Sequence, residues 1–216
     1  MGNPTDARSA APNPVTPGAK KKAVGFTTRG SWQSRISSHE SFNHDSIDHL
    51  GYDWSRVGDP HITPRRPLKV YIPETLEEVV KCVKDANKLG EKIVMRSKGH
   101  SSNGLVLTDR GTIMLIERLN KVLEIDEKNM TATVMSGVVS AELDDMLAER
   151  GLGLAIIGDH NHITVGGFCS VGGISPASHR FGMFVDTVQR IQYVDWDGNS
   201  GWCSATENSE MFDKLR

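Results

Sequence analysis

Two glycine-marked segments carry the residue types that most plainly suggest chemistry. The first, residues 96–104, reads Arg-Ser-Lys-Gly-His-Ser-Ser-Asn-Gly, and the second, residues 164–174, holds two Gly-Gly pairs separated by four residues. Glycine lets the backbone take positive φ and approach a ligand closely, so successive N–H groups can converge on an anion such as a diphosphate. Together with their hydroxyl side chains, the two segments predict turns that hold a long, doubly phosphorylated cofactor.

Neither segment fits the commoner nucleotide-binding signatures. The spacing from Gly99 to Gly104 is that of a P-loop, but Leu105 stands where the lysine is required, and Gly173 takes that place in the second segment. No Gly-x-Gly-x-x-Gly opens a helix either. The sequence therefore argues against a kinase or a GTPase, and it does not support a Rossmann site.

A strand-helix-strand unit is expected to position the first glycine segment. Apolar runs predict strands at residues 69–72 and 92–95. Between them, a Thr-x-x-Glu capping box at Thr75 starts a helix whose apolar residues recur at three- and four-residue spacing until Gly90. Such units favour a parallel sheet with its binding crevice beyond the carboxyl ends of the strands, so the glycine segment should face the ligand.

The rest of the domain alternates short strands and helices. Strands are predicted at residues 112–117, 123–126 and 131–135, and a helix capped by Ser140 is expected to run to Arg150. A hairpin of strands at 188–196 and 202–204 precedes a helix over residues 207–215. The pattern predicts an α+β fold.

Composition and charge disfavour several classes of protein. The 25 basic and 27 acidic side chains nearly cancel, so a nucleic-acid partner is not expected. Cys82, Cys169 and Cys203 are scattered without a Cys-x-x-Cys pair, which argues against a disulfide framework or a zinc ribbon. No apolar stretch is long enough for a signal-peptide core or a membrane span, so we expect a cytoplasmic protein without a membrane partner.

The first sixty residues look unlike a core. Residues 1–23 are rich in Ala, Pro, Gly and Lys without apolar periodicity, and we expect residues 1–60 to form a disordered tail and a polar connector, with the domain over residues 61–216. The cluster from His44 to His49 carries two histidines and two aspartates, which are metal-ligand types. Because no strand or helix is predicted to fix those ligands, we expect a solvated connector and no metal.

A family resemblance becomes visible in two strings. RSKGHSSNG and, about sixty residues later, GDHNHITVGGFCSVGGISPASHRFGMFVDTVQRIQYVDWDGN resemble the FAD-binding domain of the vanillyl-alcohol oxidase and p-cresol methylhydroxylase (PCMH) superfamily, most closely its cytokinin dehydrogenase and other FAD-linked oxidase branches. The resemblance covers residues 64–216 and implies a two-subdomain FAD-binding domain whose first turn wraps the FAD diphosphate. In that family a strand completing the domain and a separate substrate domain follow. We therefore expect either a fragment truncated at its C-terminal end or a second polypeptide that supplies the remainder.

The resemblance also assigns a role to His100. In the family, a histidine at this place is often bonded to the 8α carbon of the flavin, and a neutral imidazole, with an ordinary pKa near 6.5, is nucleophilic at physiological pH. The alternative is that His100 only hydrogen-bonds the turn. The berberine bridge branch makes a second link through a cysteine where this chain has His162, and Cys169 does not match, so one link at most is expected.

Asp159 is the candidate catalytic residue. In cytokinin dehydrogenase the matching aspartate accepts a proton from the substrate amine during hydride transfer, and an apolar ring beside a carboxylate raises its pKa. Alternatively, Asp159 caps the second glycine segment through backbone amides. The neighbouring His160 and His162 allow a metal interpretation, but their spacing favours exposure of both on a loop. Cofactor contacts are expected from Ser97, Lys98, Gly99, His100, Ser101, Asp159, Thr164, Gly166, Gly167, Ser170, Gly173 and Ile174.

The sequence thus predicts an FAD-dependent oxidase or dehydrogenase. It would move a hydride from an alcohol, amine or sugar-like small molecule to the flavin and pass the electrons to oxygen or another acceptor. Two alternatives stay open: a non-catalytic FAD-binding fragment or one chain of a split flavoenzyme, and the same fold doing reductive chemistry with NADPH. Lys98 and Leu105 depart from the cytokinin dehydrogenase pattern, which argues against a cytokinin as the substrate.

Overall fold

The computed structural model describes residues 48–53, 63, 65–102 and 104–216 of the 216-residue chain. Most of the expected tail and connector, and the side chains of the candidate metal cluster near His44, lie outside the described residues. Within the expected connector, the 3-10 turn η2 (Asp48–Gly51) is described. Leu50, which is 2% exposed, packs into a core cluster with strand residues, and Asp53 is 1% exposed. Part of the expected connector therefore belongs to the packed domain.

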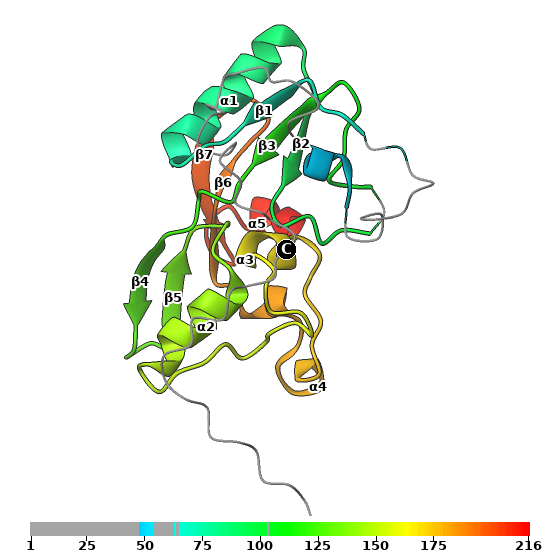
Figure 1. Ribbon diagram of the computed structural model, residues 1–216. Coiled ribbons are helices and arrows are strands. Elements are labelled where there is room, and N and C mark those ends of the chain that lie inside the picture. Colours follow the sequence, from blue (N-terminus) through cyan, green and yellow to red (C-terminus); the bar gives the residue numbers. More distant parts are fainter. Residues whose placement is uncertain (1–47, 54–62, 64, 103) are drawn as a thin grey trace, which may run out of the picture.

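A parallel three-stranded sheet and one helix form the upper part of the molecule (Figure 1). Its strand order is β1 (Lys69–Tyr71), β3 (Thr112–Leu115), β2 (Ile93–Arg96), and α1 (Leu76–Leu89) packs on one face. The predicted strand-helix-strand unit is confirmed.

The capping expected at Thr75 is also present. Its Oγ1 accepts the Glu78 N–H at 3.2 Å, while the Glu78 carboxylate accepts the Glu74 N–H at 2.7 Å, one residue earlier than a standard capping box requires. The helix ends at Gly90, whose φ of 65° is left-handed. These local signals explain why α1 begins and ends where the sequence indicates.

The lower part of Figure 1 contains an antiparallel pair, β4 (Val122–Asp126) and β5 (Thr131–Val134), covered by α2 (Ser140–Ala148). Our expectation that Ser140 caps α2 is wrong, because Val139 is the N-cap and Ser140 is the first helical residue. Val139 forms a bridge with Thr164, and the Ser140 N–H donates to Ile163 O at 2.9 Å. Pairing with that neighbouring segment fixes Val139 as the last extended residue, so the helix begins one residue earlier than the sequence indicates.

The predicted hairpin is present as β6 (Arg190–Val194) and β7 (Ser200–Ser204), followed by α5 (Ser209–Leu215). These elements lie between the upper and lower parts in Figure 1. The hairpin tip contacts α1, where the Asn87 side chain donates to Trp196 O and a Cβ on Gly198 would lie 2.6 Å from Lys84 Cγ. The α+β prediction is confirmed, and no helix in the described part of the chain is long and apolar enough to cross a membrane.

Candidate cofactor site

The first glycine segment follows β2 at the carboxyl edge of the parallel sheet, as expected. Arg96, the last residue of β2, is 7% exposed, and a Cβ on Gly99 would lie 2.5 Å from its Nη2 atom. Gly99 also has a φ of 74°, a conformation that other L residues rarely adopt. Glycine is therefore required at this position for two reasons: the backbone has a left-handed φ, and a side chain would clash with the guanidinium of Arg96.

Charged side chains surround the base of this turn. Burial lowers the pKa of Arg96 to about 10, and the carboxylates of Glu117 and Asp53 oppose that shift. Lys98 Nζ lies 3.3 Å from Glu117 Oε2, and Asp53 Oδ2 accepts the Gly104 N–H at 2.6 Å. Two cations and two carboxylates thus meet at the turn.

Two hydroxyls in the turn are buried without a partner. The Oγ atoms of Ser97 and Ser101 are shielded from solvent and have no hydrogen-bond partner among the described residues. Burying a hydroxyl without a partner is costly, so a ligand rich in hydrogen-bonding atoms at this turn would relieve the cost. Both serines are among the cofactor contacts that the sequence predicts.

A cavity of about 210 Å³ opens beside the turn, between the parallel sheet and the start of α2. Its lining combines both parts of the molecule: Ile72, Lys98, Leu115, Glu117, Arg118, Asn120, Gly137, Val139 and Glu142. Sequence reasoning missed the contribution of the segment before α2. The signal available there was Gly137, where a Cβ would lie 2.2 Å from Ile116 O, but this close approach spans 21 residues and is invisible to a local pattern.

His100 packs against a second histidine. Its ring is half-buried and meets that of His160 edge to face, with the centroids 4.4 Å apart and the planes at 68°. Burial lowers the pKa of His100 to about 4, and His160, Lys98 and His162 add to this effect. His100 is therefore neutral at physiological pH, as an attacking nucleophile must be.

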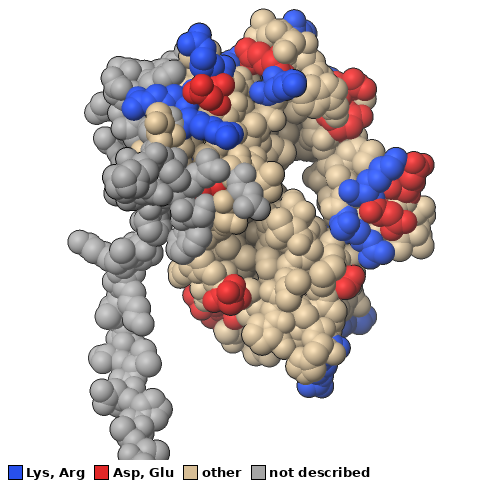
Figure 2. Space-filling view, turned by 90° about the vertical axis from the view of Figure 1, so that its right-hand side faces the viewer, with Lys and Arg blue, Asp and Glu red and all other residues tan. Residues whose placement is uncertain are grey.

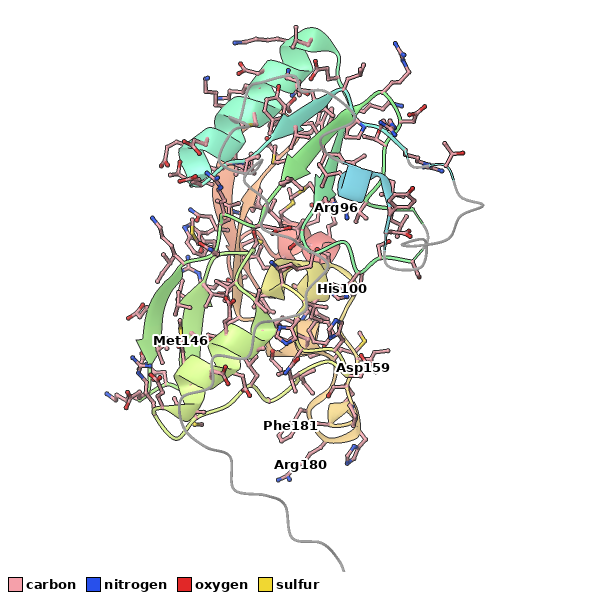
Figure 3. The ribbon with its side chains drawn as sticks, in the orientation of Figure 1. Arg96, His100, Met146, Asp159, Arg180 and Phe181 are labelled. Carbon is pink, nitrogen blue, oxygen red and sulfur yellow. The ribbon has the colours of Figure 1, made fainter. Side chains whose placement is uncertain are left out.

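The loop that carries Asp159 lies below His100 in Figure 3. The Asp159 side chain is exposed, and its Oδ1 accepts the N–H of the next residue, His160, at 2.8 Å. Asp159 thus caps its own loop, whereas the alternative role inferred from the sequence is a cap on the second glycine segment. His162 is exposed as expected, but His160 is only partly exposed because its ring contacts His100.

The first half of the second glycine segment is a helix, α3 (Val165–Ser170), which corrects the expected turn. Thr164 Oγ1 accepts the Gly167 N–H at 3.4 Å as an N-cap, and the Gly166 N–H donates to Ser136 O at 2.8 Å. Ser170 Oγ donates to Gly166 O at 2.8 Å. The hydroxyls of Thr164 and Ser170 and the Gly166 amide therefore make contacts within the protein.

The second half of that segment turns at Gly172 and Gly173, whose φ values are 84° and 70°. A Cβ on Gly173 would lie 2.6 Å from Phe184 Cβ, so this glycine permits packing on the aromatic pair Phe168 and Phe184. Ile174 follows and is 71% exposed. The chain then continues through α4 (Ser178–Phe181) and the 3-10 turn η3 (Phe184–Thr187).

The face of the molecule seen in Figure 2 has few charges at the centre of its described part. Figure 2 shows Lys, Arg, Asp and Glu side chains toward the edges of this face and other residue types across a broad middle. Among the residues that the structure describes, no group of three or more His, Cys, Asp or Glu side chains is arranged to hold a metal ion. The site therefore combines backbone amides, hydroxyls and the His100 imidazole with the ion pair of Lys98 and Glu117.

Residues 67–204 match the family described as an FAD binding domain, and because this is more than half of the chain, the chain belongs to that family. An oxidoreductase encoded in the fasciation locus of Rhodococcoides fascians is 30% identical over 70% of this chain and 34% of its own length. 6-Hydroxy-D-nicotine oxidase from Arthrobacter nicotinovorans superposes with a TM-score of 0.70 at 25% identity, covering 91% of this chain and 40% of that one.

A third relative bears on cofactor attachment. Glucooligosaccharide oxidase from Acremonium strictum, a structure described by its 6-S-cysteinyl, 8α-N1-histidyl FAD, superposes with a TM-score of 0.68 at 26% identity, covering 82% of this chain and 37% of that one. The chain spans about a third of the length of the curated relatives it matches. None of these three relatives is a cytokinin dehydrogenase, so that finer assignment stays a prediction.

The observed turn fits the FAD that the family implies. The buried hydroxyls of Ser97 and Ser101 have no hydrogen-bond partner among the described residues, and the left-handed φ of Gly99 gives the turn a shape in which successive backbone amides can converge on a diphosphate. The adjacent cavity extends from Lys98 to the start of α2. The predicted fold, an FAD-binding domain of the PCMH type, and the predicted cofactor are confirmed.

Proposed function

We propose that this chain is the cofactor-binding part of an FAD-dependent oxidase or dehydrogenase. The enzyme would move a hydride from an alcohol, amine or sugar-like substrate to the flavin and pass the electrons to oxygen or another acceptor. The observation that carries the proposal is the first glycine turn, preformed beside the neutral imidazole of His100. The relatives support the reaction class, since two of them are oxidases, one of a nicotine derivative and one of glucooligosaccharides.

His100 is the residue that we propose binds the flavin covalently at its 8α carbon. Its ring is kept neutral by burial and lies against the ring of His160, and a neutral imidazole is the nucleophilic form. The histidyl FAD of the Acremonium oxidase supports this choice. The FAD itself supplies the redox chemistry, while the chain holds the diphosphate with turn amides and orients the imidazole.

Asp159 is proposed as the proton acceptor for the substrate. It is exposed on the loop that also places His160 against His100, so its carboxylate is open to a ligand arriving from solvent. A base must reach the proton it abstracts, and the loop gives it that access. The rest of such an enzyme, in the same or a second polypeptide, would bind the substrate over the flavin ring.

The test is to add FAD to the purified chain and precipitate it with acid. We expect wild-type protein to remain yellow, whereas His100→Gln should bind FAD and lose the colour on precipitation. His179→Gln is the matched control, because His179 is exposed on α4 and its Nδ1 lies 2.9 Å from Pro176 O, within its own turn. Complete release of FAD from wild type would contradict the covalent link, and failure to take up FAD would contradict the proposed function.

A further inference from the structure

A long-range contact joins the N-terminal turn to the first glycine segment. Asp53 is 1% exposed, and its Oδ2 accepts the N–H of Gly104 at 2.6 Å, a contact between residues 51 positions apart. Gly104 closes the glycine segment and has a φ of 72°. A short, buried hydrogen bond to a carboxylate is among the stronger contacts a backbone amide can make. Asp53 therefore holds the far end of the turn that begins at Arg96.

The segment that carries Asp53 is itself fixed by the core. Leu50 packs with Val70 and Ile113 of the parallel sheet, and the Arg65 N–H donates to Gly51 O at 3.1 Å. A carboxylate on an anchored segment can act as a fixed point, because holding it in place costs little additional entropy. The Gly104 amide is thus tied to the same sheet that ends in Arg96.

The Asp53 carboxylate also interacts with the buried guanidinium of Arg96, inside the turn. Asp53 and Glu117 both stabilise the charged guanidinium of buried Arg96, which fills the space beneath Gly99. With Lys98 paired to Glu117, the two positive and two negative charges balance. The turn therefore presents amides and hydroxyls to a ligand, and its shape depends on Arg96 staying in place.

We propose that Asp53 is a positioning residue of the cofactor site, which clamps Gly104 through its hydrogen bond so that the turn is shaped for a dinucleotide diphosphate before the cofactor binds. This inference rests on the proposed FAD function. It assigns a role in the site to a segment that the sequence pattern places in a connector.

The experiment compares Asp53→Ala, Asp53→Asn and the control Asp195→Ala in the full chain. Asp195 Oδ1 accepts the Asn199 N–H at 2.7 Å in the β6–β7 turn, so this control also removes a carboxylate that holds a backbone amide. Hydrogen exchange of the Gly104 amide is measured without FAD, and the FAD dissociation constant is measured by fluorescence titration.

We expect Asp53→Ala to speed exchange at Gly104 about tenfold or more and to weaken FAD binding about tenfold, while amides in α1 keep their protection. Asn retains an acceptor for the Gly104 N–H, so Asp53→Asn should keep both quantities within about threefold of wild type. Asp195→Ala should leave both unchanged. Rescue by Asn separates a positioning role from general destabilisation.

Unchanged Gly104 exchange and FAD affinity in Asp53→Ala would overturn the inference. Equal loss of protection at Gly104 and throughout α1 would overturn it too, because Asp53 would then only support the fold. If Asp53→Ala does not fold, the decision falls to Asp53→Asn: retained Gly104 protection and FAD affinity support the clamp, and their loss in a folded Asp53→Asn overturns it. A wild-type chain that takes up no FAD contradicts the proposed function, while the exchange measurement still decides whether Asp53 clamps the turn.

Discussion

The two glycine segments have similar compositions and different structures. In the first, Gly99 takes a left-handed φ, and the missing Cβ leaves room for the guanidinium of Arg96. The turn keeps two buried hydroxyls, on Ser97 and Ser101, without partners among the described residues. It is open to a ligand.

The second segment uses its glycines for packing within the protein. Gly166 sits in α3 against Ser136, and Gly173 sits against Phe184. Its hydroxyls on Thr164 and Ser170 already have partners. The comparison teaches that Gly-Gly alone does not identify a phosphate-binding turn; hydrogen-bonding groups left without a partner do so more directly.

Gly166→Ala should cause the largest loss of stability. A Cβ there would lie 2.6 Å from Ser136 Cβ and 2.9 Å from Ser136 O, and the backbone cannot yield easily because the Gly166 amide donates to that oxygen. Overpacking of this kind costs about 2–3 kcal/mol, measured as the free energy of unfolding in urea. The neighbouring Gly167→Ala is the control: its Cβ would meet only Thr164 Oγ1 at 3.1 Å, and alanine favours a helix. Equal losses in both variants would contradict the packing role.

Gly99→Ala should cause the next largest loss of stability, and it should also weaken FAD binding. The left-handed φ costs about 1–2 kcal/mol, and Arg96 must move as well. Gly90→Ala is the matched control, since Gly90 has a φ of 65° but no atom of the described residues lies within 4 Å of the added Cβ. Both variants should lose stability on thermal unfolding, Gly99→Ala more than Gly90→Ala because Arg96 must also move, but only Gly99→Ala should bind FAD more weakly. An equal loss of FAD affinity in both variants would contradict a specific role of Gly99 in the cofactor site.

A smaller loss is expected when the cap of α3 is removed. Thr164→Val keeps the β-branched shape but removes the Oγ1 that accepts the Gly167 N–H at 3.4 Å, which should cost about 0.5–1 kcal/mol in urea unfolding. Thr133→Val, at an exposed position of β5, serves as the control and should change stability little. If Thr164→Val abolished FAD binding while stability held, the hydroxyl would be a cofactor ligand and the contrast between the segments would weaken.

Substitution of His100 should have the smallest effect on stability at neutral pH. Its pKa falls from 6.5 to about 4 on folding, so between these values the unfolded chain binds more protons than the folded chain. His100 should therefore reduce stability as the pH falls from about 6.5 toward 4 and have no such effect above that window. His100→Gln should flatten this part of the stability profile measured by chemical denaturation, whereas His179→Gln should not. Parallel profiles for wild type and His100→Gln would contradict the lowered pKa.

The predictable parts of the fold were those whose signals are local. Thr75, the apolar spacing of α1 and Gly90 lie within sixteen residues, and they locate the helix because each acts on its immediate neighbours. The first glycine turn is predictable for the same reason, since it follows directly from β2.

The parts that sequence reasoning missed depend on distant pairings. Val139 caps α2 because it pairs with Thr164, and Asp53 reaches Gly104 across 51 residues. Helical Gly166 and Gly167 were misassigned because their low helix propensity is outweighed by the Thr164 cap and by packing on Ser136. No local pattern records such contacts.

The central claim, that the first turn holds FAD with its flavin beside His100, is tested most directly by peptide mass spectrometry. Trypsin cleavage after Lys98 and Arg110 yields a peptide of residues 99–110 with His100 near its start. After incubation of the chain with FAD, we predict that fragmentation places the mass of the flavin on His100. A chain that has taken up FAD but yields this peptide only unmodified would contradict the account.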